Sequence, residues 1–143
     1  MPAQRTLLLI TASSPAIRRV RRSRVLNFQQ ITMPYLAAFV PHDWEMIHID
    51  EEVSPVDVTQ VVDLVGITFH TPSAFHAYDL AAQFRRRRIP VALGGPHVTL
   101  TPAYERRNIA ERPSLRHSAV LFRCEHLSTP VALCGRAVVD FAA

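Results

Sequence analysis

Hydroxyl, imidazole and glycine residues gather in three short stretches of this 143-residue chain. Ser13 and Ser14 follow one apolar run, residues 68–71 follow a second, and residues 94–99 follow a third. Such residues offer hydrogen-bond donors and acceptors, and adjacent glycines let a ligand approach the backbone closely. The stretches therefore predict a binding site. For Gly94 and Gly95 alone, a plain strand-to-helix turn that needs a positive φ is the favoured interpretation, and only their place at the ligand edge of the predicted sheet favours a binding role.

Several common uses of such loops are excluded by the residues themselves. Neither GxGxxG nor GxxxxGK[ST] occurs, so the usual glycine-rich cradles for dinucleotides and triphosphates are missing. Ala12, Ser13 and Thr68 stand where a phosphate-accepting receiver domain needs acidic residues. No serine or cysteine stands beside a recognisable base and acid, and the seven histidines lack HxxxH or HExxH spacing. We therefore predict no catalytic residue and no metal ligand in this chain.

The formal net charge is +4, and all sixteen basic residues are arginine. Residues 85–88 are four arginines that close a helical pattern, where cations complement the helix C-terminus. Residues 18–24 hold five arginines in a predicted loop, which is equally consistent with plain solvation and with an anionic ligand or acidic partner. A basic nucleic-acid-binding or protein-interaction α/β domain is thus the alternative function. It ranks second because aromatic interleaving and a helix-turn-helix pattern are missing.

Apolar runs alternate with helical patterns along the first two thirds of the chain. We expect strands at residues 5–12, 44–49, 63–69 and 90–93, a short helix or turn at 55–62, and helices that begin at Thr32, Thr71 and Thr101. This alternation predicts an α/β fold, a flavodoxin-like doubly wound parallel five-stranded sheet in the order 2-1-3-4-5. Its buried central strands should be residues 7–10, 64–67 and 91–93. Ligands of such sheets bind beyond the carboxyl ends of the strands, where the three polar stretches meet.

The rest of the chain is expected to complete the same domain. Residues 1–102 form its predicted core, and residues 103–143 are a divergent or truncated C-terminal part, with a fifth strand at 118–122 and a last helix at 130–141. Cys124 and Cys134 lack CxxC spacing and are interpreted as reduced thiols. No apolar run reaches the roughly 20 residues that span a bilayer, and residues 5–12 are interpreted as a strand instead of a signal peptide. We therefore expect a cytoplasmic protein with no membrane partner.

Two longer segments carry a family resemblance. MPYLAAFVPHDWEMIHIDEEVSPVD and DLVGITFHTPSAFHAYDLAAQFRRRRIPVALGGPHVTLTP resemble the amino-terminal cobalamin (vitamin B12)-binding domain of radical S-adenosylmethionine enzymes. The most specific pieces are LAA with the IDEE strand end, LVGIT with TP after it, and GGPHVT. The resemblance covers residues 5–102.

The resemblance implies that cobalamin is the cofactor, with its corrin over the carboxyl ends of the strands. Its nucleotide tail would pass Gly94 and Gly95 in a crevice beside the sheet, with hydroxyl groups from Thr68 and Thr71. Replacing Gly95 by leucine should then obstruct the crevice without touching the core. The implied cofactor-binding residues are Ser13, Ser14, Thr68, His70, Thr71, Gly94, Gly95, Pro96, His97 and Thr99.

Two motifs of related proteins are missing from the sequence. Many cobalamin proteins carry DxHxxG, whose histidine coordinates cobalt; without it, the resemblance implies cobalamin bound base-off with no protein histidine on cobalt. CxxxCxxC is also missing, so we expect no iron–sulfur cluster in this chain. The expected function is a cobalamin-binding module that looks like a stand-alone or truncated part of a cobalamin-dependent radical S-adenosylmethionine enzyme, and that belongs, without enzyme activity of its own, to a radical methyltransferase-type system. An iron–sulfur radical S-adenosylmethionine protein or domain would be its partner.

Overall fold

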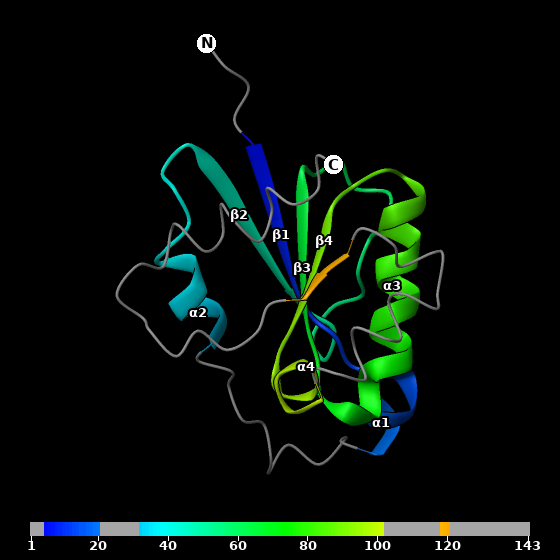
Figure 1. The fold of residues 1–143 in the computed structure, drawn as a ribbon. Coiled ribbons are helices and arrows are strands. Elements are labelled where there is room, and N and C mark those ends of the chain that lie inside the picture. Colours follow the sequence, from blue (N-terminus) through cyan, green and yellow to red (C-terminus); the bar gives the residue numbers. More distant parts are fainter. Residues whose placement is uncertain (1–4, 21–31, 102–117, 121–143) are drawn as a thin grey trace.

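The computed structural model describes residues 5–20, 32–101 and 118–120 (Figure 1). Strands β1 (Arg5–Thr11), β2 (Trp44–Asp50), β3 (Leu64–Thr68) and β4 (Val91–Gly94) form a parallel sheet in the order β2-β1-β3-β4. A three-residue strand, β5 (Ser118–Val120), pairs in parallel with β4. The predicted α/β class with a parallel sheet is confirmed. The order of the first four strands also agrees with the prediction.

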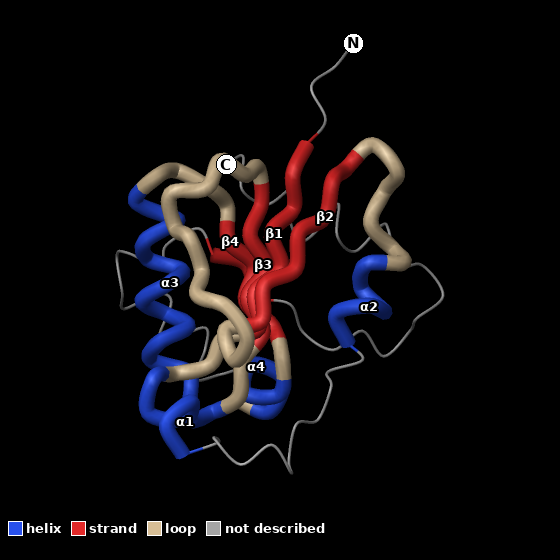
Figure 2. Tube along the Cα trace, turned by 180° about the vertical axis from the view of Figure 1, so that it is seen from behind, coloured by secondary structure: helices blue, strands red, loops and turns tan. Residues whose placement is uncertain are grey.

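Helices lie on both sides of the sheet, as Figures 1 and 2 show. Helix α3 (Ala74–Arg86) covers one face and is preceded by the 3₁₀ turn η2 (Thr71–Ser73). Helix α2 (Thr32–Ala37) lies on the opposite side. The short helices α1 (Pro15–Val20) and α4 (Pro96–Leu100) lie near the carboxyl ends of the strands.

The core is built on the central strands, which are apolar along most of their length. Residues 7–10, 64–65, 67 and 91–93 are all buried, as a strand covered on both faces requires. From α3, Ala77, Ala81 and Phe84 pack onto one face at the spacing of a helix stripe. Met33 of α2 packs with Leu7 on the other face. The three predicted central strands are therefore confirmed.

The structure corrects the sequence-based elements in the loops. The sequence predicts a loop at residues 94–99 and a helix starting at Thr101, but helix α4 occupies Pro96–Leu100 and Thr101 is its C-cap. Proline at the first helical position starts this helix, whereas β-branched Val98 and Thr99 hide it in the sequence. The loop predicted for residues 18–24 is also wrong in part, because Arg18 lies in α1.

Smaller differences concern the ends of elements. Helix α2 ends at Ala37, earlier than its apolar pattern indicates, and residues 38–40 continue in turns before Pro41. Residues 55–62 contain a turn at residues 58–60 and no helix, which agrees with the turn of the predicted helix or turn. The predicted helix at 130–141, the end of the strand predicted at 118–122 and most of the segment 103–143 lie outside the described residues. The domain boundary near residue 102 stays a prediction.

Candidate functional site at the carboxyl ends of the strands

The loops after β1, β3 and β4 lie together at one edge of the sheet. The amide of Ala12 donates to the Thr68 carbonyl at 2.9 Å, and the amide of Phe69 donates to the Gly94 carbonyl at 3.3 Å. The chain leaves β1 toward β2 on one side and continues with β3 on the other, so the strand order reverses at this point. Open α/β sheets bind their ligands at this kind of position. The structure therefore brings the three polar stretches of the sequence together.

The loop after β1 leaves one buried polar atom without a partner. The amide of Ser13 donates to a carboxylate oxygen of Glu51 at 3.0 Å, and the amide of Ser14 donates to the Ser73 hydroxyl at 3.2 Å. Only 3% of Ser13 is exposed, yet its hydroxyl has no hydrogen-bond partner among the residues that the structure describes. Buried hydroxyls are normally satisfied, so this one marks a candidate contact for a polar group of a ligand.

The double glycine has a structural reason in this protein. Gly95 has φ = 99°, and a Cβ atom built there would lie 2.5 Å from the Thr68 hydroxyl oxygen and 2.9 Å from the Phe69 amide nitrogen and carbonyl oxygen. The loop after β4 therefore packs directly on the end of β3. The expectation that Gly95→Leu would leave the fold intact is wrong, because the new side chain would collide with the end of a central strand.

The other predicted residues divide into a buried and an exposed group. His97 is buried, and its Nδ1 lies 2.9 Å from the Thr71 hydroxyl, which joins α4 to η2. His70 and Pro96 are exposed at the same edge, and Gly94 is partly exposed. Thr99 lies in α4. The exposed residues thus form an outer rim beside a buried set at the ends of β1 and β3.

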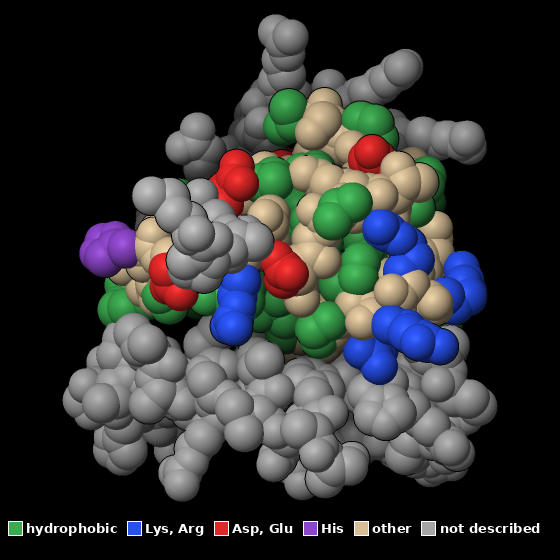
Figure 3. Space-filling view, turned by 90° about the horizontal axis from the view of Figure 1, so that it is seen from above, with side chains coloured by type: hydrophobic (Ala, Val, Ile, Leu, Met, Phe, Trp, Pro, Cys, Tyr) green, Lys and Arg blue, Asp and Glu red, His purple; other side chains and the backbone are tan. Residues whose placement is uncertain are grey.

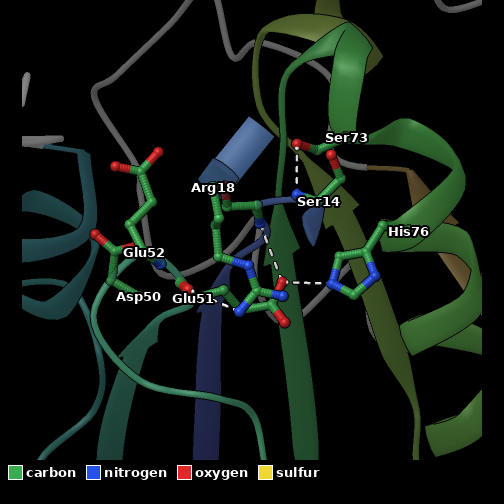
Figure 4. Close-up of polar contacts among 8 residues, drawn as sticks. Ser14, Arg18, Asp50, Glu51, Glu52, Ser73 and His76 are labelled. Atoms are coloured by element: carbon green, nitrogen blue, oxygen red, sulfur yellow. Dashed lines mark hydrogen bonds and ion pairs between the residues drawn. The ribbon is translucent and has the colours of Figure 1, made fainter. Parts of the chain in front are cut away.

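Sequence reasoning missed a short contact between a buried carboxylate and a histidine beside the β1 loop (Figure 4). Glu51 follows β2 and is only 4% exposed, and its carboxylate lies 2.7 Å from Nε2 of His76 on α3. Arg18 of α1 donates to the Glu51 backbone carbonyl at 3.1 Å. The available signal was the acidic run at residues 50–52, placed directly at a strand end. Its histidine partner is distant in the sequence and could not be assigned.

The chain is similar to parts of two methyltransferases. It is 30% identical over 112 residues to an uncharacterized methyltransferase of Pyrococcus horikoshii. This match covers 71% of this chain and 24% of that protein. It is 48% identical over 40 residues to the bacteriochlorophyllide d C-8(2)-methyltransferase of Chlorobaculum tepidum. This second match covers 28% of this chain and 9% of that protein. The chain thus spans a quarter or less of the length of these relatives. No family model and no solved structure matches it.

The described parts of the chain contain neither a cluster of metal ligands nor a membrane-spanning helix. No group of three or more histidine, cysteine, aspartate or glutamate side chains there is placed to hold a metal ion. None of the helices there is long and apolar enough to cross a membrane.

Arginine side chains gather on one side of the face seen from above in Figure 3, where α3 ends in Arg85 and Arg86. Several arginines contact the chain itself. Arg85 donates to the Ile89 carbonyl at 3.2 Å, and partial burial lowers its pKa. Arg87 and Arg18 likewise donate to backbone carbonyls. These three guanidinium groups already donate to the chain itself, which leaves fewer of their donors for nucleic-acid phosphates.

Arg87 fixes the turn before β3. Its guanidinium donates to the carbonyls of Val58, Thr59 and Gln60, the last two at 2.9 Å. In the same turn, hydrogen bonds from the hydroxyl and then the amide of Thr59 lower the pKa of Asp57. A carboxyl group with a lowered pKa stabilises the fold at neutral pH, and this contribution is lost as the pH falls through that lowered value.

We expect Arg87→Ala to reduce the free energy of unfolding by about 1 kcal/mol, because exposed hydrogen bonds from a charged donor are worth about that much. Urea denaturation followed by circular dichroism measures the change. Arg86→Ala is the matched control, since Arg86 is an exposed neighbour at the same helix end. Equal effects of the two substitutions would show that the turn contacts contribute nothing specific.

Proposed function

We propose that this chain is a cobalamin-binding module of a methyltransferase-type system. The observation that carries the proposal is the meeting of the β1, β3 and β4 loops at the point where the strand order reverses. The Ser13 hydroxyl, which has no hydrogen-bond partner in the part of the chain that the structure describes, lies in the loop after β1. The similarity to parts of two methyltransferases supports the same class of system.

The residues present fit part of the expected cofactor site. Ser13 offers a buried hydroxyl, and the exposed His70, Thr71 and Pro96 offer an outer rim. Gly95 packs directly against Thr68, which leaves no space for a ligand between them, so the nucleotide tail would have to enter beside this contact. Bound cobalamin would supply a cobalt centre that carries a transferable group, and the protein would bind and orient it.

The catalytic chemistry belongs in this proposal to another domain or protein. The described residues hold no group with the spacing of a metal site, and the sequence lacks CxxxCxxC. We therefore propose an iron–sulfur radical S-adenosylmethionine protein or domain as the partner that uses the bound cofactor.

Titration of the purified protein with hydroxocobalamin and methylcobalamin tests the proposal. We expect a changed visible spectrum and a coloured complex that co-elutes with the protein in gel filtration. Fluorescence anisotropy with random oligonucleotides at low and physiological salt should show no tight binding. Tight, salt-sensitive oligonucleotide binding without cobalamin binding would reject the proposal in favour of a nucleic-acid-binding function.

Ser14→Trp should weaken cobalamin binding by at least about tenfold, which corresponds to 1.4 kcal/mol, because it places a large ring on the partly exposed loop after β1. Glu45→Trp is the matched control, since Glu45 is exposed near the amino end of β2, at the opposite edge of the sheet. If both variants bound cobalamin like the wild type, the cofactor would not lie over the β1 loop.

His70→Ala tests the absence of a histidine ligand on cobalt. His70 is exposed and follows β3, so its removal should not disturb the core. We expect the spectrum of the bound cobalamin to be unchanged. A spectrum that changes with His70→Ala in the way that loss of a nitrogen ligand requires would show that histidine coordinates cobalt after all.

A further inference from the structure

Glu51 is a charged residue in an unusually buried position. Burying a carboxylate is costly unless hydrogen bonds replace its water, and an apolar side chain of similar volume would fill the same space at lower cost. Here two groups contact the same carboxylate oxygen, the Ser13 amide at 3.0 Å and His76 Nε2 at 2.7 Å. The carboxylate is therefore fixed between the loop after β1 and helix α3 (Figure 4).

The backbone of Glu51 is held as well. Its amide donates to the Thr11 carbonyl at 3.1 Å, and its carbonyl accepts a hydrogen bond from Arg18 at 3.1 Å. One residue at the end of β2 thus contacts the end of β1, helix α1 and helix α3. Its side chain has few conformations left, so it can hold a neighbour in place at little further entropic cost.

The neighbour that it holds is the loop of the candidate site. Side chains from two separate segments accept hydrogen bonds from two consecutive amides of this loop, Glu51 from Ser13 and Ser73 from Ser14. Both acceptor residues are buried. The Ser13 hydroxyl, in contrast, has no partner among the described residues. The protein thus fixes the backbone of Ser13, while no described residue bonds to its hydroxyl, which is the group proposed to contact the ligand.

We infer that Glu51, held by His76, is a positioning residue that fixes the Ser13 and Ser14 loop for ligand binding. The inference rests on the proposed cobalamin function for the identity of the ligand. The positioning itself depends only on contacts within this chain. His76 keeps the buried carboxylate satisfied and oriented, and the carboxylate orients the Ser13 amide.

Amide hydrogen exchange and cobalamin titration on the full chain test this role together. Glu51→Met keeps the side-chain length but removes the acceptor, and Glu51→Gln keeps an acceptor oxygen. We expect Glu51→Met to speed exchange of the Ser13 amide by about tenfold and to weaken hydroxocobalamin binding by a similar factor. Glu51→Gln should retain both wild-type values. His76→Leu should shift both in the same direction as Glu51→Met, because it leaves the carboxylate with one partner fewer.

Two comparisons separate positioning from general stability. The amide of Val65 in the buried strand β3 reports on global opening and should exchange as in the wild type. Glu45→Met makes the same substitution at an exposed site on β2 and should change neither measurement. Unchanged Ser13 exchange in Glu51→Met, or an equal rise at Val65, would overturn the inference.

The cobalamin titration tests whether cobalamin is the ligand for which the loop is positioned. If the wild type binds and Glu51→Met binds equally well despite faster Ser13 exchange, then the loop is not positioned for this ligand and the inference is wrong. If the wild type does not bind cobalamin, the proposed function fails, and the exchange data alone decide whether Glu51 fixes the loop.

Discussion

Gly95→Leu should destabilise the protein by about 2 to 6 kcal/mol, the sum of the cost of a backbone conformation that is almost restricted to glycine and the cost of overpacking. Gly95 has φ = 99°, and its missing Cβ would lie 2.5 Å from Thr68 Oγ1. Both Thr68 and Phe69 are buried at the end of a central strand and have little room to move. A loss of this size removes much of the stability of a small domain.

Urea denaturation followed by far-ultraviolet circular dichroism measures this loss. Gly95→Ala should already show most of it, because the collision involves the first side-chain atom. Gly94→Ala is the matched control: Gly94 ends strand β4, and Gly95 is the only described glycine with a positive φ. A Gly95→Leu protein within about 1 kcal/mol of the wild type would show that the loop can move away from β3.

Gly95 also shows which parts of the structure could be predicted from the sequence and which could not. The strands were predictable because unbroken apolar runs such as residues 64–67 are typical of strands that are buried on both faces in the middle of a parallel sheet. That the loop after β4 would lie at the ligand edge followed from the βαβ alternation. Whether Gly95 faces a ligand or its own chain depended on a contact with Thr68, 27 positions earlier in the sequence, which no local pattern encodes.

Glu51 and His76 illustrate the same limit for polar residues. The run at residues 50–52 looks like a solvated strand end, and only its middle residue is buried. The burial depends on His76 approaching from α3 and on the Ser13 amide approaching from β1. Helix α4 was missed for a different reason, because two of its five residues, Val98 and Thr99, are β-branched and it has no capping signal other than Pro96. Nonlocal contacts and weak local propensity thus account for the corrections.

Phe69 joins several parts of the candidate site beneath its surface. It follows β3 and is only 1% exposed. Its ring lies edge-on to Tyr78 of α3, with centroids 5.7 Å apart, and 5.6 Å from the ring of His97 in α4. Its amide and carbonyl bond to Gly94 and His97. One aromatic side chain therefore packs between the two helices that flank the loops after β3 and β4.

Phe69→Ala should lower the free energy of unfolding by about 3 to 5 kcal/mol, since it removes a fully buried ring and leaves a cavity that the surrounding helices and strands can fill only in part. Phe75→Ala is the matched control, because Phe75 lies at the start of α3 and is 69% exposed; its effect should stay within about 0.5 kcal/mol. Urea denaturation of both variants measures the difference. Similar small effects would mean that the α3 and α4 contacts of Phe69 do not hold this edge of the sheet together, and that the loops of the candidate site are positioned by their hydrogen bonds alone.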